Sequence, residues 1–591
     1  MRAFFKSVFA SFLALVLFCG VGFGLLIFLL AAVGAKSRPT VPAKAVLILD
    51  LDATLVERTG ETEPGEALQA ALRGGEGRRH SLSQLLEAVD TAAGDEHVAG
   101  LFLTGNLQGG GPAQLKELRQ ALARFREKKP VVAWNLNYGR GDYYLATAAS
   151  QLLVHPLGIV QANGLASEPM FFGGAFKKYG VEVQVTRVGK FKSAVEPYVL
   201  DKMSAENREQ IQTLLDDLWA EWKATVGGAR KLAPEALQSL ADEKGLLKGE
   251  EAVQAKLVDR TATYDEVLDQ LKGLVGKKAT DRDFPQIEVG AYHAAAFSPK
   301  VSGGRIAVLY AEGEIVDGEG AANQIGGERL ARELRRLRLD PQVKAVVLRV
   351  NSPGGSAQAS ELIQREVILT KKDKPVVISM SHLAASGGYW ISTYGSRILA
   401  EPTTITGSIG VFGLLPNVQK LAAEHGITWD SVQTAKLANP QTLSRPKRPE
   451  ELARIQSVVD QIYDRFLDKV AEGRHLKRDA VHEIAQGRVW SGQTGLKLGL
   501  VDELGGLQDA VKAAAKLANL TDYHVQGPAA EPDGFLKAVL KGLTQGKPKR
   551  VTKAGPVDVL KGEALHQLEV LESLNDPQGI YARMPFELGL K

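Results

Sequence analysis

The chain contains two versions of one long unit, and this internal duplication limits the folds open to it more than any other feature. Residues 131–147 align with residues 376–393 with a single gap, and residues 95–111 match residues 340–356. These matches keep nearly one offset through turns and glycines. A period this long indicates duplication of a whole domain and not an array of short solenoid repeats.

Each repeat predicts an α/β domain. Short apolar strands alternate with helical stretches, and no two-residue hairpin turns separate them, which is typical of βαβ units and a largely parallel sheet. At 591 residues the chain is too long for one core. We therefore expect an N-terminus and membrane anchor at 1–40, a first repeat at 41–271, a linker at 272–304, a second repeat at 305–522 and a tail at 523–591.

The N-terminus predicts a transmembrane helix. Residues 8–35 are almost wholly apolar, and a run longer than about 20 residues can span a bilayer. Arg2 and Lys6 precede the run, which favours a cytoplasmic N-terminus and an extracytoplasmic body. Residues 33–35 offer an alternative in which the segment is cleaved. The only cysteine, Cys19, lies inside this run, so the exported body has no disulfides.

Composition excludes some functions. The formal net charge of +4 is too small to indicate nucleic-acid binding. The sequence has no H-E-x-x-H motif, no clustered Cys and His residues and no phosphate-binding loop. We therefore expect no metal and no cofactor.

The two repeats differ where a catalytic pair is needed. Ser386 of the second repeat aligns with Arg140 of the first, and Lys192 of the first aligns with Ala438 of the second. One repeat offers a serine without a lysine, and the other a lysine without a serine. This pattern predicts a single Ser/Lys dyad shared between the repeats.

Ser386 lies between an apolar strand and a helical stretch, where its hydroxyl is near the positive end of a helix dipole. The N–H of Gly387 is then placed to donate to an oxyanion. Serine at such a turn is most often only a helix N-cap. The turn at 351–356 offers a second donor, Gly354 or Gly355, although a tight structural turn explains these glycines equally well.

Lys192 needs burial to act as a base, because an exposed ammonium has a pKa of about 10.4. Its apolar neighbours suit partial burial. Lys190 is an alternative base, but it aligns with Lys436 and so is common to both repeats. His382, four residues before Ser386, is interpreted as a loop histidine because no carboxylate is evidently placed to orient it.

Four motifs resemble the signal peptide peptidase A family, also called protease IV, in its long form with tandem repeats. They are G-K-F-K-S-A-V-E-P (189–197), N-S-P-G-G-S (351–356), A-A-S-G-G-Y-W-I-S-T (384–393) and T-G-S-I-G-V-F-G (406–413). The resemblance implies a crotonase/Clp-protease-like fold in each repeat and a homotetramer with an apolar groove that faces the membrane. It also implies Ser386 as nucleophile, Lys192 as general base and Ser408 as the residue that orients the lysine. Gly387 and either Gly354 or Gly355 would form the oxyanion hole.

The implied function is degradation of cleaved signal peptides in or at the membrane. Apolar peptides and the lipid bilayer would be the partners, and the enzyme would be a single-pass protein of the inner (plasma) membrane with its bulk on the periplasmic side. Two other classes stay open at this point. One is an acyl-CoA-handling crotonase-like enzyme, and the other is a membrane scaffold whose dyad is incidental.

Overall fold

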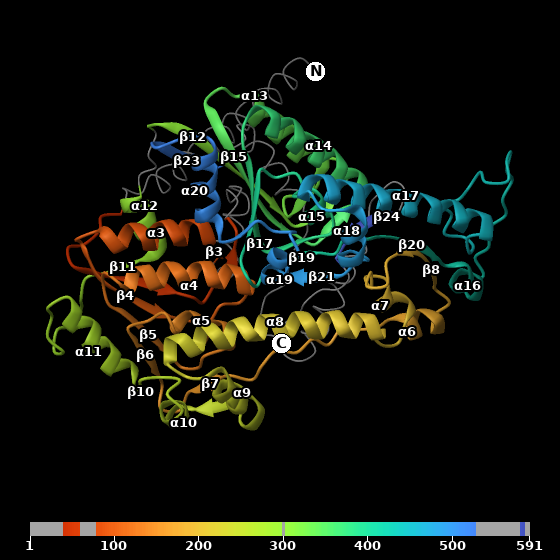
Figure 1. Cartoon of the computed structure of the whole chain (residues 1–591). Helices are drawn as coiled ribbons and strands as arrows, with labels where there is room; N and C mark the ends of the chain where they lie inside the picture. Colours follow the sequence, from red (N-terminus) through yellow and green to blue (C-terminus); the bar gives the residue numbers. More distant parts are fainter. Residues whose placement is uncertain (1–38, 59–78, 298–301, 528–579, 585–591) are drawn as a thin grey trace, which may run out of the picture.

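A computed structural model describes residues 39–58, 79–297, 302–527 and 580–584 (Figure 1). The predicted transmembrane segment lies outside these residues. Among the helices that are described, none is long and apolar enough to cross a membrane.

The first repeat is built on a parallel six-stranded sheet in the order β10-β6-β5-β4-β1-β11. Helices α3, α4, α8 and α12 pack on one face of this sheet, and α11 packs on the other. The elements are β1 (Ala45–Asp50), α3 (Leu82–Gly94), β4 (Val98–Thr104), α4 (Pro112–Arg126), β5 (Val131–Asn135), α5 (Arg140–Ala146), β6 (Gln151–Val154), α8 (Ala205–Arg230), α9 (Pro234–Glu243), α10 (Gly249–Gln254), β10 (Arg260–Thr261), α11 (Tyr264–Leu274), β11 (Gln286–Glu288) and α12 (Val289–Ala296).

The second repeat has parallel strands in the matching order β22-β18-β17-β15-β12-β23. Its core lies between these strands and α13, α14 and α17, while α20 covers the opposite face. The elements are β12 (Gly304–Glu312), α13 (Gly327–Leu339), β15 (Val343–Ser352), α14 (Ala357–Asp373), β17 (Val376–Ala385), α15 (Gly387–Trp390), β18 (Arg397–Ala400), β19 (Ile405–Gly407), α17 (Pro449–Arg474), α18 (Arg478–Ile484), β21 (Val489–Ser491), α19 (Gly492–Lys497), β22 (Glu503–Leu504), α20 (Leu507–Leu517) and β23 (Tyr523–Gln526).

Equivalent contacts confirm the duplication. Tyr143 donates its hydroxyl proton to the Leu257 carbonyl in the first repeat, and Tyr389 donates to the Leu500 carbonyl in the second. Helices α8 and α17 have the same length of 26 residues, and each ends at a residue in the left-handed region. The expected α/β architecture with two βαβ-rich repeats is therefore correct. Within the span expected to be a linker, residues 286–296 form β11 and α12 of the first repeat.

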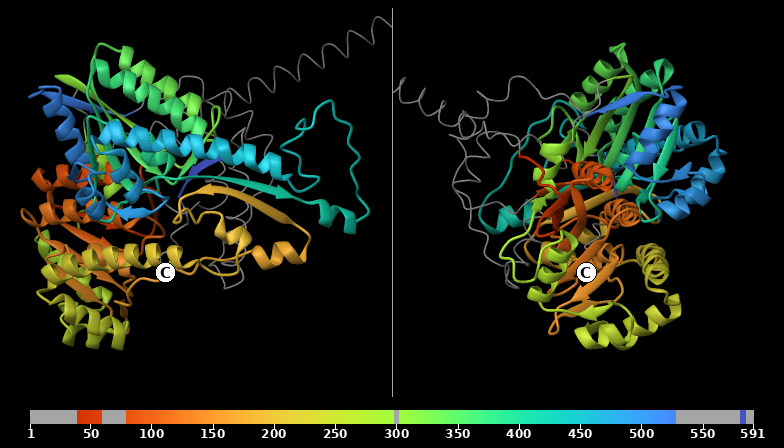
Figure 2. Two further views of the ribbon diagram at one scale, coloured as in Figure 1. Left: turned by 45° about the vertical axis from the view of Figure 1, so that its right-hand side comes forward. Right: turned by 90° about the vertical axis from the view of Figure 1, so that its left-hand side faces the viewer.

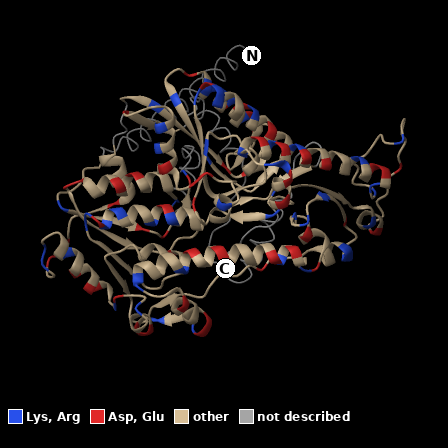
Figure 3. Cartoon of the chain, viewed as in Figure 1, with Lys and Arg blue, Asp and Glu red and all other residues tan. Residues whose placement is uncertain are grey.

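The two repeats meet at a buried ion cluster. Arg349 on β15 is fully buried and its guanidinium donates to Glu57 (Nε to Oε2, 2.8 Å) and to Glu117 on α4. Burial of a charge is costly unless the charge is paired and hydrogen-bonded. This cluster therefore holds the repeats in one relative position. On the surface, by contrast, acidic and basic residues are interspersed over the face that Figure 3 shows.

A third sheet joins the repeats and brings distant segments together. Its order is β14-β13-β16-β24-β20-β8, and β8 of the first repeat pairs antiparallel with β20 of the second, from Val411 opposite Val188 to Asn417 opposite Glu182. Figure 2 shows these two strands side by side in an arm that ends at α6 and α16. The bounds are β8 (Glu182–Val188), β13 (Glu314–Val316), β14 (Gln324–Gly326), β16 (Gly354–Ser356), β20 (Val411–Asn417), β24 (Ile580–Arg583), α6 (Gly173–Lys178), α7 (Glu196–Val199) and α16 (Gln419–Glu424).

Two small strand pairs complete the described structure. β2 (Thr54–Val56) pairs parallel with β3 (Arg79–Ser81), and β7 (Ile159–Gln161) pairs antiparallel with β9 (Leu246–Lys248).

Candidate active site

Ser386 lies between β17 and α15, as the strand-to-helix interpretation predicts. Its backbone is at φ 54° and ψ −111°, an uncommon conformation for a residue with a side chain. The Ser386 N–H donates to the Gly407 carbonyl (2.8 Å), which fixes this turn against the end of β19. The side chain makes no capping hydrogen bond to α15. The N-cap alternative therefore does not explain this serine.

Lys192 reaches the second repeat because it follows β8, which is paired with β20. The loop that carries Lys192 contacts residues just before β21. Phe191 N–H donates to the Gln486 carbonyl (3.0 Å), and Gly487 leaves room for the lysine backbone. A β-carbon at Gly487 would lie 2.6 Å from Lys192 N, too close for any real side chain. The second repeat thus positions the lysine of the first.

The structure brings Lys192, Ser386 and Ser408 together inside one chain. Lys192 Nζ lies 2.8 Å from Ser386 Oγ, 3.0 Å from Ser408 Oγ and 3.1 Å from the Ser408 carbonyl oxygen. All three residues have no exposed surface. The two residues that the repeats keep separately therefore form a direct contact across the repeat boundary.

Burial lowers the pKa of Lys192 well below its ordinary value of 10.5, and the positive charge of Arg583 lowers this pKa further. Among the described residues, no carboxylate lies within ion-pairing distance of its amine. A neutral amine has two N–H groups and one lone pair. The two Ser408 oxygens are suitable acceptors for the N–H groups, which leaves the lone pair for the Ser386 hydroxyl.

The other candidate bases are placed differently. Lys190 is exposed, and its ammonium lies over the Phe191 ring, 5.1 Å from the centroid. His382 is partly buried and its ring packs against Gly111 of the first repeat, where a β-carbon would lie 1.9 Å from the ring. Burial lowers the pKa of His382 to about 4. His382 lies at the contact between the two repeats.

The three glycines expected around the oxyanion lie together beside Ser386. A β-carbon built on Gly354 would be 2.7 Å from the Gly387 nitrogen, so the two backbones are in close contact. Gly354 has φ 99° and Gly355 has φ 151°, a pair of values that side chains rarely tolerate. Gly354 N–H already donates to Ser352 Oγ (3.2 Å).

A polar network that the sequence patterns do not predict holds the lysine loop. Gln210 on α8 donates to the Phe191 carbonyl (2.9 Å) and to Ser193 Oγ (2.9 Å), and it accepts from Val489 N–H (3.3 Å). Gln210 is buried and links the lysine loop to β21. One signal in the sequence points to it: Gln210 aligns with Arg454, so the repeats differ here as well.

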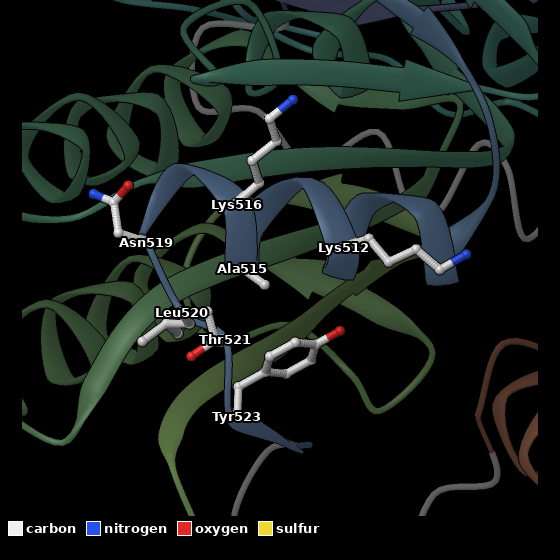
Figure 4. A pocket seen from close by; sticks show the side chains of 7 residues that line it. All are labelled: Lys512, Ala515, Lys516, Asn519, Leu520, Thr521 and Tyr523. Carbon is white, nitrogen blue, oxygen red and sulfur yellow. The ribbon is translucent and has the colours of Figure 1, made fainter.

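A hollow beside α20 and β23 is lined by Lys512, Ala515, Lys516, Asn519, Leu520, Thr521 and Tyr523. Its polar side chains point in different directions and do not converge on one point (Figure 4). Within the described ranges, no group of three or more His, Cys, Asp or Glu residues is arranged to hold a metal ion.

Comparisons with known proteins identify the family. The family model "Peptidase family S49" matches residues 123–278 and 368–521, one match in each repeat. "Protease 4" of Salmonella typhi is 35% identical over 599 residues, which cover 98% of this chain and 95% of the relative. "Putative signal peptide peptidase SppA" of Enterococcus faecium is 35% identical over 241 residues, 40% of this chain and 70% of the relative. A solved ClpP1 mutant of Listeria monocytogenes has 14% identity and a TM-score of 0.24 over 34% of this chain and 94% of its own.

The two-repeat α/β fold and the matches to the family model and to Protease 4 together define a serine protease. The chain belongs to peptidase family S49.

Proposed function

We propose that this serine protease is a membrane-anchored endopeptidase that cleaves apolar peptides with a Ser386/Lys192 dyad. One observation carries the proposal: the buried 2.8 Å contact between Lys192 Nζ and Ser386 Oγ, made by residues of different repeats. A buried, neutral lysine beside a serine hydroxyl is the arrangement that activates a serine without a histidine. The fold proposed for each repeat remains the crotonase/Clp-protease type.

The first step is attack on the peptide carbonyl. Neutral Lys192 takes the proton of the Ser386 hydroxyl, and the Ser386 oxygen bonds to the carbonyl carbon of the substrate. The carbonyl oxygen gains negative charge, which N–H donors of the glycine turn and of Gly387 stabilise. We favour Gly355 over Gly354 as the donor from the turn, because Gly354 N–H already has Ser352 Oγ as acceptor.

The second step is release of the amine. The protonated Lys192 donates to the departing nitrogen while the C–N bond breaks, and an acyl-enzyme on Ser386 is left. Ser408 offers two oxygens to the ammonium during this step. Water then attacks the acyl group, with Lys192 again accepting a proton, and Ser386 is regenerated. The mechanism needs no cofactor.

The proposed substrates are signal-peptide remnants, which are apolar and remain in the membrane after precursor cleavage. An anchor in residues 8–35 would hold the enzyme at the inner membrane, with its body on the periplasmic side. The arm beyond β8 and β20 exposes apolar side chains, including Trp429 at 50% and Val432 at 99%. Such exposed apolar groups support contact with a membrane or with further copies of the chain in a homotetramer.

The catalytic test compares four forms of the detergent-solubilised full chain on a fluorogenic apolar peptide. Ser386→Ala is expected to reduce cleavage to background, and Lys192→Ala to reduce kcat by about 10²–10⁴-fold because a general base is lost. Lys190→Ala is the matched control and should retain wild-type activity. Normal cleavage by Lys192→Ala, or its loss in Lys190→Ala, would show that the base is assigned wrongly.

The substrate class needs a separate measurement. Cleavage of a synthetic signal peptide in detergent micelles is compared with cleavage of a polar peptide of equal length, with Ser386→Ala as the blank. We expect a higher kcat/KM for the signal peptide. Equal values for the two peptides would contradict the proposed preference without affecting the dyad.

A further inference from the structure

A buried carboxylate lies next to the lysine loop (residues 189–195) and has no role in the proposed mechanism. It belongs to Glu196, the first residue of α7, which is only 1% exposed. The carboxylate accepts the Ser204 hydroxyl proton (2.6 Å), the Ser204 N–H (3.2 Å) and a bond from the Asn207 side-chain amide (3.0 Å). Because a buried charge is costly unless it is paired or hydrogen-bonded, these donors stabilise Glu196 in its place.

The carboxylate fixes the direction in which the Asn207 amide points. An ionised carboxylate can only accept hydrogen bonds, so the NH2 group of Asn207 faces Glu196 and its oxygen faces the other way. On that side Asn207 Oδ1 accepts from Ser193 Oγ (2.8 Å) and from the Gln210 amide (3.2 Å). Glu196 therefore sets the direction of the hydrogen bonds that run from it to the lysine loop.

These hydrogen bonds end on both sides of Lys192. The Gln210 amide donates to the Phe191 carbonyl and to Ser193 Oγ, each at 2.9 Å. Phe191 and Ser193 are the residues directly before and after the lysine. The Gln210 oxygen accepts the Val489 N–H of β21 (3.3 Å), so the same network joins the lysine loop to the second repeat.

The second repeat has different residues at these positions. In the alignment of the repeats, Thr442 is opposite Glu196 and Glu451 is opposite Asn207. The buried carboxylate of the second repeat is therefore on the helix, and its partners are two arginines just before α17. The residue opposite Lys192 in that repeat is an exposed alanine. A loop carboxylate that orients a helix amide is thus found in the repeat that carries the lysine.

We infer that Glu196 is a positioning residue for the proposed base. Acting through Asn207 and Gln210, it holds the lysine loop so that the amine of Lys192 stays buried against Ser386. The inference rests on the proposed Ser386/Lys192 function and adds to it a residue that acts on the dyad through other side chains. A loop that leaves this position exposes the amine to water, and exposure raises the pKa of a lysine towards its ordinary value.

The first test removes the carboxylate and assays the detergent-solubilised full chain on the fluorogenic apolar peptide. Glu196→Ala leaves the Asn207 amide without its acceptor, and kcat should fall about 10²-fold with little change in KM, the loss expected when a reacting group is misplaced by about 1 Å. The acid limb of the pH–kcat profile should move to higher pH, because a less buried amine is protonated at higher pH. Glu196→Gln keeps a carbonyl oxygen that can accept from Asn207 and should retain most of the wild-type kcat.

Asp217→Ala is the matched control. Asp217 is also on α8, and its carboxylate accepts from Ser491 Oγ (2.5 Å) and Thr494 Oγ1 (2.8 Å) of the second repeat, neither of which belongs to the lysine loop. This variant should lower the unfolding temperature and leave the acid limb unchanged. An unmoved acid limb in Glu196→Ala, or equal losses of kcat in Glu196→Ala and Asp217→Ala, would overturn the positioning role.

The second test breaks the bond between Glu196 and Asn207 and then restores it. Asn207→Asp places a second carboxylate against Glu196, so the hydrogen bond is lost and kcat should fall. Adding Glu196→Gln supplies an N–H donor to the new carboxylate, and the double variant should regain about tenfold or more in kcat over Asn207→Asp alone. No recovery in the double variant would contradict the coupling and leave the peptidase function intact. Absence of cleavage by wild type, or full activity in Ser386→Ala, would instead refute the proposed function.

Discussion

Ser408→Ala tests whether the proposed catalytic lysine, Lys192, depends on the hydrogen bonds that it makes in its charged form. In the proposed mechanism Lys192 becomes an ammonium after taking the Ser386 proton, and it then has three N–H donors. Ser386 Oγ, Ser408 Oγ and the Ser408 carbonyl are its three acceptors, at 2.8, 3.0 and 3.1 Å. The substitution removes one acceptor and keeps the carbonyl.

The expected loss follows from the strength of one hydrogen bond to a charged group, about 1.5–3 kcal/mol. This corresponds to a fall in kcat of about 10- to 150-fold, with little change in KM. Both protonation states lose this bond, but the ammonium loses the stronger, charge-assisted one, so the pKa of Lys192 falls further. The acid limb of the pH–kcat profile, where the lysine becomes protonated, should therefore move to lower pH.

Steady-state assays from pH 5 to 10 on a fluorogenic apolar peptide measure both effects. Ser491→Ala is the matched control, because Ser491 is also buried and hydrogen-bonded through its hydroxyl but belongs to the N-cap of α19. It should leave the pH profile unchanged. Unchanged kcat in Ser408→Ala, or an acid limb that moves to higher pH, would refute the role given to Ser408.

Three further outcomes are expected. Lys192→Met should be inactive, and yet it should unfold at a higher temperature than wild type at neutral pH. Burial lowers the pKa of Lys192 in the folded wild type below 10.5, so the unfolded chain binds the proton more readily. The stability of wild type therefore falls as the pH decreases below 10.5. The difference in Tm between this variant and wild type should shrink as pH rises towards 10.5, and a constant difference would contradict the assigned burial effect. Arg349→Ala leaves two carboxylates buried without their cation and should lower the free energy of unfolding by about 3–5 kcal/mol in a denaturant titration. Gly487→Ala should reduce kcat, because the added β-carbon would displace Lys192. Gly426→Ala is the control: Gly426 also has a positive φ but faces open space, so this substitution should lower stability and leave kcat unchanged.

Comparison of the two repeats is enough to locate the candidate pair of residues. Ser386 and Lys192 stand out because each lacks a counterpart in the other repeat, whereas Lys190 has one. The fold places the first two in contact and leaves Lys190 exposed. Gln210 shows the limit of this reasoning. The sequence alignment of the repeats shows that Gln210 differs from Arg454. It does not predict which loop carbonyl a polar side chain on a helix will bind.

Local periodicity and matching residues along one chain suffice to establish the duplication, the parallel βαβ architecture of each repeat and the short list of chemically distinctive residues. The meeting of distant segments depends instead on the tertiary fold: β8 pairs with β20 and delivers Lys192 to Ser386, and β24 pairs with β16 and β20 near the end of the chain. Strand pairing between segments hundreds of residues apart depends on backbone hydrogen bonds, which every residue type except proline can donate. Such pairing therefore leaves little trace in the amino-acid sequence.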